Sequence, residues 1–230
     1  STMRCAVSWG KAGGDPVLRT SGLKLTRETI AARLIDYAGL SVQDPYPDGF
    51  FTQAPRRAAV LIALFHEQRA WRLLFIRRAQ VPGDRHSGEV AFPGGRLEAQ
   101  DAGPDAAALR EAREEVGLHP ARVCVLGHLP DYRTVSNFLV TPVVAEIAWP
   151  ASLRPAPAEV SHIFSIPMPW LADPHNRRIQ RKYLSNPGLA LPVIYFRPYQ
   201  GEQLWGVSAR ITLSLLQVLG LTAAEPGRGP

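Results

Sequence analysis

A short strand that ends in two glycines, followed by a helix with a defined start and stop, constrains the fold of this chain more than any other feature. Residues 89–92 are typical of a strand, and Gly94-Gly95 just beyond it permit backbone shapes and close approaches closed to other residues. Pro104 fits the first turn of a helix, and Gly117 fits the left-handed residue that ends one. The sequence therefore predicts a strand, a glycine turn, a loop and a helix over residues 104–116.

The remaining segments predict a mixture of strands and helices. A helix is predicted from Thr26 to Gly39, with four apolar residues along one side: Ile30, Leu34, Ile35 and Ala38. Further strands are predicted, the first two as a hairpin, at 58–66, 71–77, 123–129, 138–147, 162–166 and 193–197. An amphipathic helix over 206–219 closes the chain. Because strands and helices do not alternate strictly, we expect an α+β fold with a mixed sheet between helices.

The length of 230 residues suits one domain with additions, or at most two small domains. We expect a flexible N-terminal arm over residues 1–25, a single domain over 26–220 and a C-terminal tail over 221–230. The longest apolar run, 58–65, is too short to span a bilayer, and the first residues lack a secretory signal pattern. Two cysteines, Cys5 and Cys124, are too few for a disulfide framework or a zinc site. We therefore expect structural or free thiols and a cytoplasmic location.

The formal net charge of +6 favours anionic partners, such as phosphorylated metabolites, nucleic acid or acidic membranes. Excess charge also keeps a protein soluble, and on charge alone that explanation is preferred. The positive residues are mostly arginine, whose planar guanidinium matches phosphate oxygens.

The helix over 104–116 carries a patch of three carboxylates. Glu111 and Glu115 are one helical turn apart, and Glu114 lies beside them. Their mutual repulsion destabilises the helix, and a divalent cation with oxygen ligands, Mg²⁺ or Mn²⁺, would relieve it. Alone, such a patch is typical of a solvated surface with pairs such as Arg110 and Glu114. The carbonyl of Gly95, brought near by the strand–turn–helix order, could reach the same cation.

Together, these residues resemble the Nudix signature, G-x5-E-x7-R-E-U-x-E-E-x-G-U, where U is a bulky aliphatic residue. The match comprises Gly95, Arg110-Glu111, Glu114-Glu115, Gly117 and Leu118. Two departures occur. Ala112 replaces a larger aliphatic residue, and fourteen residues instead of thirteen separate Gly95 from Arg110. The early glutamate of the signature is replaced by Glu98 or Asp101.

The resemblance implies an α/β/α sandwich with a mixed sheet and a metal-dependent pyrophosphohydrolase. It implies that Glu111 and Glu115 are the main metal ligands, with Glu114 assisting and Gly95 lending its carbonyl oxygen. It also implies that Arg110 orients a glutamate through a salt bridge.

A second motif is similar to that of the coenzyme A diphosphatase subfamily, L-L-T-x-R-(S/A)-x3-R-x3-G-x3-F-P-G-G. The corresponding residues here are Leu73-Leu74-Phe75-Ile76-Arg77-Arg78, Gly88 and Phe92-Pro93-Gly94-Gly95, with a middle section two residues longer. This resemblance implies hydrolysis of coenzyme A to 4′-phosphopantetheine and adenosine 3′,5′-bisphosphate. The basic residues expected to bind the phosphates of such a substrate lie in one loop beside the metal site: Arg77, Arg78, Arg85 and His86.

The general base is left open by the motif. Glu114 on the helix, Glu146 on a strand and Glu159 in a loop rich in proline and alanine are the candidates. Because family members often draw the base from a later loop, Glu159 is slightly favoured.

Two other functions compete with coenzyme A hydrolysis. The substrate could be another nucleoside diphosphate derivative, such as ADP-ribose or a dinucleotide. The chain could also be a non-catalytic module that binds nucleotide or RNA, but the three intact glutamates favour catalysis. No basic strand motif rich in aromatic residues is evident, so we expect a small-molecule substrate and no nucleic-acid or membrane partner. The sequence leaves the oligomeric state open.

Overall fold

The computed structural model describes residues 25–36, 44–83, 86–183 and 189–222. The elements in chain order are α1 (Arg27–Asp36), β1 (Arg56–Glu67), β2 (Ala70–Arg78), β3 (Val90–Ala91), β4 (Gly94–Arg96), α2 (Pro104–Val116), the 3-10 turn η1 (Pro120–Arg122), β5 (Val123–His128), β6 (Tyr132–Arg133), β7 (Phe138–Ile147), β8 (Val160–Pro167), α3 (Met168–Ala172), the 3-10 turn η2 (Pro174–Asn176), β9 (Arg177–Tyr183), β10 (Ala190–Phe196) and α4 (Gly206–Val218). The predicted arm over 1–25 and tail over 221–230 lie almost entirely outside the described residues.

The central sheet is mixed, as predicted. Its path is β3-β2-β1-β7-β5, with β8 beside β2, β4 beside the first part of β1, and β6 beside the first part of β7. Strands β1 and β7 run parallel, and their neighbours run antiparallel to them. Strand β1 is a nearly continuous apolar run because both faces of the sheet are covered there.

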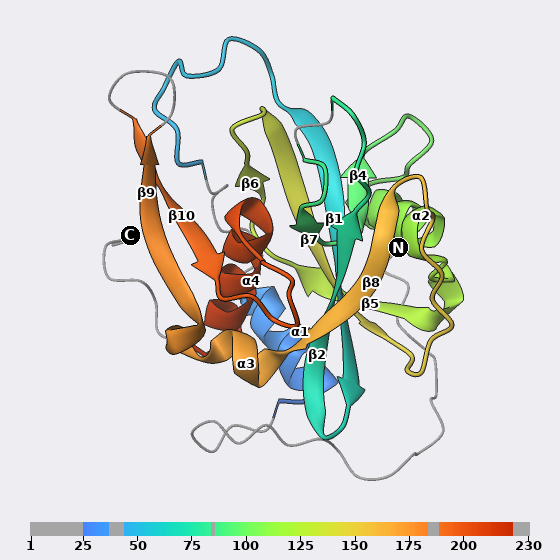
Figure 1. The fold of residues 1–230 in the computed structure, drawn as a ribbon. Coiled ribbons are helices and arrows are strands. Elements are labelled where there is room, and N and C mark those ends of the chain that lie inside the picture. Colours follow the sequence, from blue (N-terminus) through green and yellow to red (C-terminus); the bar gives the residue numbers. More distant parts are fainter. Residues whose placement is uncertain (1–24, 37–43, 84–85, 184–188, 223–230) are drawn as a thin grey trace.

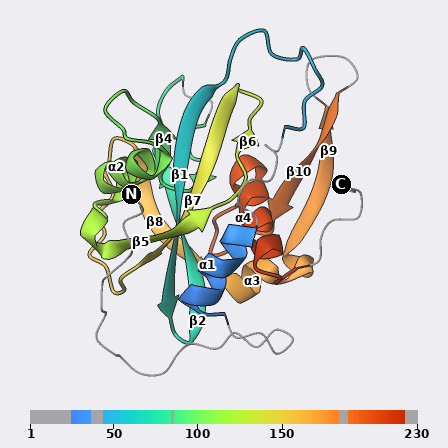
Figure 2. The ribbon, with the colours of Figure 1, turned by 180° about the vertical axis from the view of Figure 1, so that it is seen from behind.

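Helices cover both faces of the sheet (Figures 1 and 2). A hydrophobic core lies between each face and its helices. On one face, Ala108 and Ala112 of α2 pack against Leu61 of β1, and their small side chains let the helix approach the sheet closely. On the other face, α1 and α4 contribute buried residues such as Ile30 and Leu215. This arrangement is the α/β/α sandwich that the sequence predicted.

Several boundaries match the prediction, and others do not. The helix over 104–116, the strand over 138–147 and the first hairpin are confirmed. The prediction that Ile35 faces the core is wrong, because its side chain is 69% exposed. The prediction missed α3 and β9: the first contains a proline, and the second consists mostly of exposed polar residues.

Two further expectations concern cysteine and membrane association. Cys124 is buried and disulfide-bonded, so the expectation of a free thiol is wrong for it. Cys5, the only other cysteine in the sequence, lies outside the described residues. None of the described helices is long and apolar enough to cross a membrane.

The start of α2 is tied to the end of β5 through His128 and Asp105. Nε2 of His128 lies 2.5 Å from Oδ1 of Asp105, and this hydrogen bond raises the pKa of His128. A raised pKa in the folded state means that the pair stabilises the protein below the unfolded pKa of about 6.5. The stabilisation is lost as the pH rises through the folded pKa.

We therefore expect Asp105→Asn to lower the melting temperature more at pH 5.5 than at pH 8.5, because only protonated His128 gains from the carboxylate. The substitution keeps a polar residue in the first turn, so any loss of interaction with the helix dipole should be nearly the same at both pH values. Thermal unfolding at the two pH values checks this. A difference between wild type and variant that does not change with pH would contradict it.

Candidate functional site

A buried carboxylate links α2 to the glycine turn. Glu115 is 2% exposed, and its Oε2 accepts a hydrogen bond of 2.9 Å from the backbone N–H of Gly94. Gly94 has a φ of 157°, and a Cβ at this position would lie 2.4 Å from the carbonyl oxygen of Ala59. Only glycine therefore lets β4 run this close to β1, and this approach brings the Gly94 N–H to the helix.

Burial raises the pKa of Glu115 to about 7. The negative charges of Glu111 and Glu159 raise it further, while the Gly94 hydrogen bond and the charge of Arg78 lower it. The carboxylate thus carries its charge in a poorly solvated place beside other acids, where a bound cation would be favourable.

Glu111 lies against the second glycine of the turn. A Cβ on Gly95 would fall 2.2 Å from Oε1 of Glu111, so a side chain at position 95 would displace this carboxylate. Burial raises the pKa of Glu111, and the charges of Glu114 and Glu159 act in the same direction. The backbone of Gly95 and the two buried carboxylates therefore bring oxygen donors together from β4 and α2.

Arg110 holds the acidic residues around this site. Its guanidinium forms two hydrogen bonds with Asp101, at 3.1 and 3.0 Å. It also donates to Oε1 of Glu111 at 3.0 Å and to Oε2 of Glu114 at 3.1 Å. Arg110 therefore lies between the helix carboxylates and the loop that follows β4.

The lengthened loop between β4 and α2 uses Asp101 as its main acidic contact with Arg110. Hydrogen bonding to Arg110 lowers the pKa of Asp101, whose side chain is 4% exposed. Glu98 is half exposed and lies 4.0 Å from the guanidinium. Of the two acids that could replace the early glutamate of the signature, Asp101 is the one enclosed by the loop.

Glu159 lies over the same site on the loop after β7. The N–H of Ala156 donates to the carbonyl of Glu115 at 2.8 Å, which fixes this loop on the end of α2. The carbonyl of Glu159 accepts from Ala79 at 2.8 Å, and its side chain is exposed. The charge of Glu159 acts on both Glu111 and Glu115, so the fold brings these three acids together.

Glu146 lies elsewhere. Its carboxylate pairs with Arg27 of α1, the helix that covers the face of the sheet opposite α2. Glu146 as a general base is therefore wrong: alternation along β7 directs its side chain away from the α2 carboxylates.

The basic residues predicted to bind phosphate have different surroundings. Arg78 is close enough to Glu115 to lower its pKa. Arg77 pairs with Oε2 of the buried Glu202 at 3.0 Å, and His86 lies 2.8 Å from Glu89. Arg85 lies outside the described residues. Of the three described, Arg78 has the clearest electrostatic contact with the carboxylate site.

The donor set fits a hard divalent cation. Carboxylate and carbonyl oxygens are the ligands that Mg²⁺ and Mn²⁺ prefer. In the described part of the chain, no three acidic, histidine or cysteine side chains are already grouped as a metal site. Glu111 and Glu114 are instead held by Arg110, so a cation would share their charge with the guanidinium.

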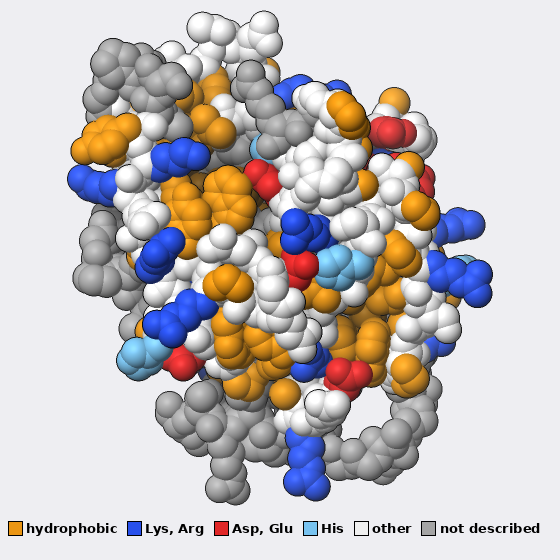
Figure 3. Space-filling model, in the orientation of Figure 1, with side chains coloured by type: hydrophobic (Ala, Val, Ile, Leu, Met, Phe, Trp, Pro, Cys, Tyr) orange, Lys and Arg blue, Asp and Glu red, His pale blue; other side chains and the backbone are white. Residues whose placement is uncertain are grey.

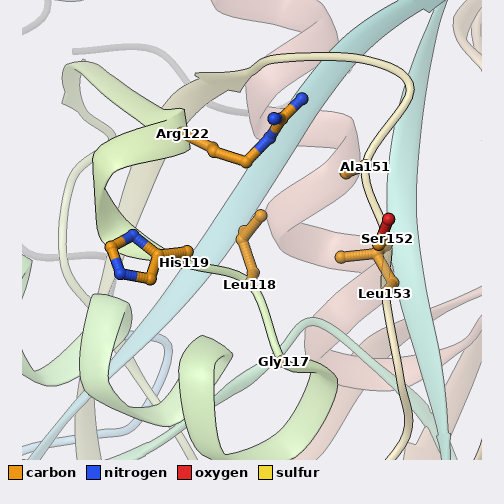
Figure 4. A pocket seen from close by; sticks show the side chains of 7 residues that line it. All are labelled: Gly117, Leu118, His119, Arg122, Ala151, Ser152 and Leu153. Atoms are coloured by element: carbon orange, nitrogen blue, oxygen red, sulfur yellow. The ribbon is translucent and has the colours of Figure 1, made fainter.

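A shallow cavity of about 220 Å³ lies beyond the C-terminal end of α2. Figure 4 shows its lining side chains coming from the segment after α2 and from the loop after β7: Gly117, Leu118, His119, Arg122, Ala151, Ser152 and Leu153. Arg122 donates to the carbonyls of Ala148 and Pro150, so it fixes the loop. None of the α2 glutamates lines this cavity.

A family model and several curated relatives that match this chain carry the same family name. The model of the NUDIX domain matches residues 55–186. The uncharacterized Nudix hydrolase NudL of Photorhabdus laumondii is 35% identical over 179 residues, which cover 76% of this chain and 91% of that protein. NudL of Pectobacterium atrosepticum is 37% identical over 159 residues, covering 68% of this chain and 79% of that protein.

Similar solved structures include a MutT/nudix family protein from Enterococcus faecalis. It has a TM-score of 0.45 and 14% identity, and the match covers 74% of this chain and 69% of that one. The Nudix hydrolase RenU from M. smegmatis has a TM-score of 0.41 and 23% identity, covering 53% of this chain and 76% of that one.

The carboxylate cluster predicts a stability that depends on divalent metal. A cation that binds only the folded state, at a hundred times its Kd, adds about 2.7 kcal/mol, or roughly 5–10 °C in melting temperature. We expect Mg²⁺ or Mn²⁺ to have this effect on the wild type and little effect on Glu115→Gln, which keeps the shape and removes the charge. Calorimetry across a metal titration checks this.

Glu98→Gln is the matched control, because it removes an exposed carboxylate outside the proposed ligand set. It should respond to metal as the wild type does. If Glu115→Gln gains as much from metal as the wild type, the cation binds elsewhere.

Proposed function

The chain belongs to the Nudix hydrolase family, whose members are pyrophosphohydrolases, and on that premise we propose that it hydrolyses the pyrophosphate bond of coenzyme A or its derivatives. The products would be 4′-phosphopantetheine and adenosine 3′,5′-bisphosphate. The observation that carries the catalytic part is the buried carboxylate of Glu115, held at the Gly94 N–H beside Glu111. The coenzyme A part is supported by the second motif, which runs from Leu73 to Gly95.

We assign Glu111 and Glu115 as the main ligands of Mg²⁺ or Mn²⁺, with Glu114 assisting and the Gly95 carbonyl oxygen completing the protein donors. When bound, such a cation neutralises pyrophosphate oxygens and lowers the pKa of a coordinated water. The chain's own contribution is to hold these oxygens in place. The Gly94 N–H orients Glu115, and Arg110 orients Glu111 and Glu114.

Arg110 has a positioning role in this proposal. Its guanidinium is bound on one side by Asp101 and on the other by the α2 glutamates. This fixed cation offsets part of the repulsion between the carboxylates that it contacts. The Asp101 bond keeps the loop after β4 closed against the helix.

For the general base we propose Glu159, with Glu114 as the alternative. Glu159 is exposed, near Glu111 and Glu115, and on a loop whose backbone is bonded to α2 and to Ala79. Glu114 has its carboxylate engaged by Arg110. A carboxylate that is accessible beside the cation site is suited to take the proton of the attacking water.

For substrate anions we propose Arg78 as the first contact, because its charge already reaches Glu115. Arg77 has its guanidinium paired with Glu202, which favours a role in holding the C-terminal part of the chain against β2. Arg85 and His86 remain candidates from the second motif. An arginine beside the cation site would hold equatorial phosphate oxygens as negative charge builds up on them.

Assays with a panel of pyrophosphate compounds test the proposed substrate. Purified protein with Mg²⁺ or Mn²⁺ should hydrolyse coenzyme A faster than ADP-ribose or a dinucleotide, with the two products identified by mass. Arg78→Gln should lower kcat/KM for coenzyme A by roughly tenfold to a hundredfold, the cost of losing one charged hydrogen-bond partner. Arg69→Gln, in the exposed turn between β1 and β2, is the matched control and should leave kcat/KM unchanged.

Faster hydrolysis of ADP-ribose than of coenzyme A would show that the proposed substrate is wrong, while the assignment as a pyrophosphohydrolase would stand. An unchanged kcat/KM in Arg78→Gln would remove the proposed phosphate contact.

The base is tested separately. Glu159→Gln should lower kcat by about a hundredfold to ten-thousandfold, which is the usual contribution of a general base. The metal-dependent rise in melting temperature should persist in this variant. If Glu159→Gln is fully active, Glu159 is not the base. Loss of activity in Glu114→Gln with the metal-dependent rise in melting temperature retained would then assign the base to Glu114.

A further inference from the structure

A surface unrelated to the carboxylate site combines positive charge with stacked aromatic rings. It lies on the ribbon of β9 and β10, which stands on the side of the molecule away from α2 in both ribbon views (Figures 1 and 2). In Figure 3 a hydrophobic patch over these two strands is bordered on its outer side by lysine and arginine side chains. We call the set Arg178, Lys182, Tyr195 and Trp205 the ribbon face.

The rings of the ribbon face are held parallel. Tyr195 and Trp205 have ring centres 5.7 Å apart and planes within 3° of each other, and a β-bridge joins their backbones. Both side chains are half-buried. Alternation along β10 sends Ile194 and Phe196 into the core and leaves Tyr195 on the outer side.

The cations of the ribbon face lie beside these rings. The guanidinium carbon of Arg178 is 5.8 Å from the ring centre of Tyr195, and Nζ of Lys182 is 5.7 Å from a ring centre of Trp205. Both distances are near the outer limit for a cation–π interaction, and both side chains are exposed. A planar ligand could therefore displace them from the rings, and they could turn to its phosphates.

All charged residues of strands β9 and β10 are basic. Strand β9 reads Arg-Arg-Ile-Gln-Arg-Lys-Tyr, and neither β9 nor β10 contains an acidic residue. Arg178, Gln180 and Lys182 alternate onto the same face and form a polar row along the strand. Glu202, three residues before Trp205, already pairs with Arg77 and His162.

We propose that the ribbon face binds single-stranded nucleic acid. Aromatic faces that stack bases, combined with cations that follow the backbone, are the recurring means of binding single strands without sequence preference. The face is open, whereas sites for small nucleotides are concave, so an extended strand is favoured over a free nucleotide. The proposal departs from the expectation from sequence that nucleic acid is not a partner.

An acidic membrane is the other partner that a basic, aromatic surface could attract. The geometry favours bases. The two rings lie parallel and have cations near them, so they offer flat stacking surfaces. Membrane anchoring needs apolar side chains that project into lipid, and the exposed apolar residues of β9, Ile179 and Tyr183, alternate onto the face opposite Arg178 and Lys182. Membrane binding is therefore treated as an outcome of the test.

The test uses the full chain and a fluorescein-labelled single-stranded RNA of about 12 nucleotides, within the range of known single-strand sites. Fluorescence anisotropy across roughly 50–200 mM salt gives the affinity and its salt dependence. We expect wild-type protein to bind this strand more tightly than the matched duplex. Excess coenzyme A should not displace it.

Two variants separate charge from stacking. Arg178→Gln/Lys182→Gln should reduce the slope of log K against log salt by about 1.4, the value for two lost phosphate contacts on a single strand. Tyr195→Leu should weaken binding by roughly fivefold to a hundredfold through loss of one stacked base, while Tyr195→Phe should bind like the wild type.

Arg69→Gln/Arg154→Gln is the matched control, because it removes the same charge from exposed positions off the ribbon. It should change the salt slope far less than the ribbon variant. Thermal unfolding of each variant shows that it is folded, and hydrolysis of pyrophosphate substrates should be unaffected, so this test is independent of the proposed substrate.

Several results would overturn the proposal. They are failure of the wild type to bind the RNA, equal binding of single strand and duplex, equal loss of affinity in the control, and displacement of the RNA by coenzyme A. Tighter binding to phosphatidylserine vesicles, lost in Arg178→Gln/Lys182→Gln, would instead assign the ribbon face to an acidic membrane.

Discussion

The hydrogen bond from the Gly94 N–H to Glu115 is the contact on which the arrangement of the site depends. It joins the turn after β3 to the last turn of α2, and both sides of it need special conditions. Gly94 needs a positive φ and the space left by a missing Cβ, because the carbonyl of Ala59 lies directly against it. Glu115 is ionised only at a cost, since burial raises its pKa to about 7. A helix that places a carboxylate here loses stability that an apolar residue would keep, and that loss is consistent with selection for chemistry.

Arg110 limits the repulsion between the other α2 carboxylates and sets a condition on metal binding. The guanidinium offers donors to Asp101, Glu111 and Glu114 at once, so negative charge on α2 is balanced before any cation arrives. A bound cation would add to this balance while leaving the Asp101 pair intact. The lengthened loop makes this possible, because Asp101 is enclosed and Glu98 remains at the surface. Asp101 lies six residues after Gly95, where the signature has its early glutamate, so the extra residue falls between Asp101 and Arg110 and their pairing is kept.

The parts of the fold that could be predicted are those whose local signals agree with their tertiary surroundings. Pro104 and Gly117 mark the ends of α2, and the apolar run of β1 matches a strand covered on both faces. The errors arise where the direction of a side chain is set by tertiary packing and not by the local sequence. Ile35 continues the apolar pattern of α1 but extends beyond the sheet into solvent. Glu146 is a plausible base by residue type, and only the pairing of β7 shows that it points to α1.

The same reasoning explains why the ribbon face could not be found in the sequence. A basic strand rich in aromatic residues is a recognisable motif, and β9 is basic with a single tyrosine at its end. The aromatic rings come from Tyr195, which is paired with Arg178 in the antiparallel register, and from Trp205, which lies beyond a turn. The combination therefore exists only after three segments have come together. Glu115 and Gly94 also come together only in the fold, but both belong to a recurring sequence motif from which their proximity can be predicted. No such motif covers the ribbon face. Surfaces assembled across strands by register alone are therefore the features that a single sequence conceals most completely, and the ribbon face proposed here is such a surface, on the side of the domain away from α2.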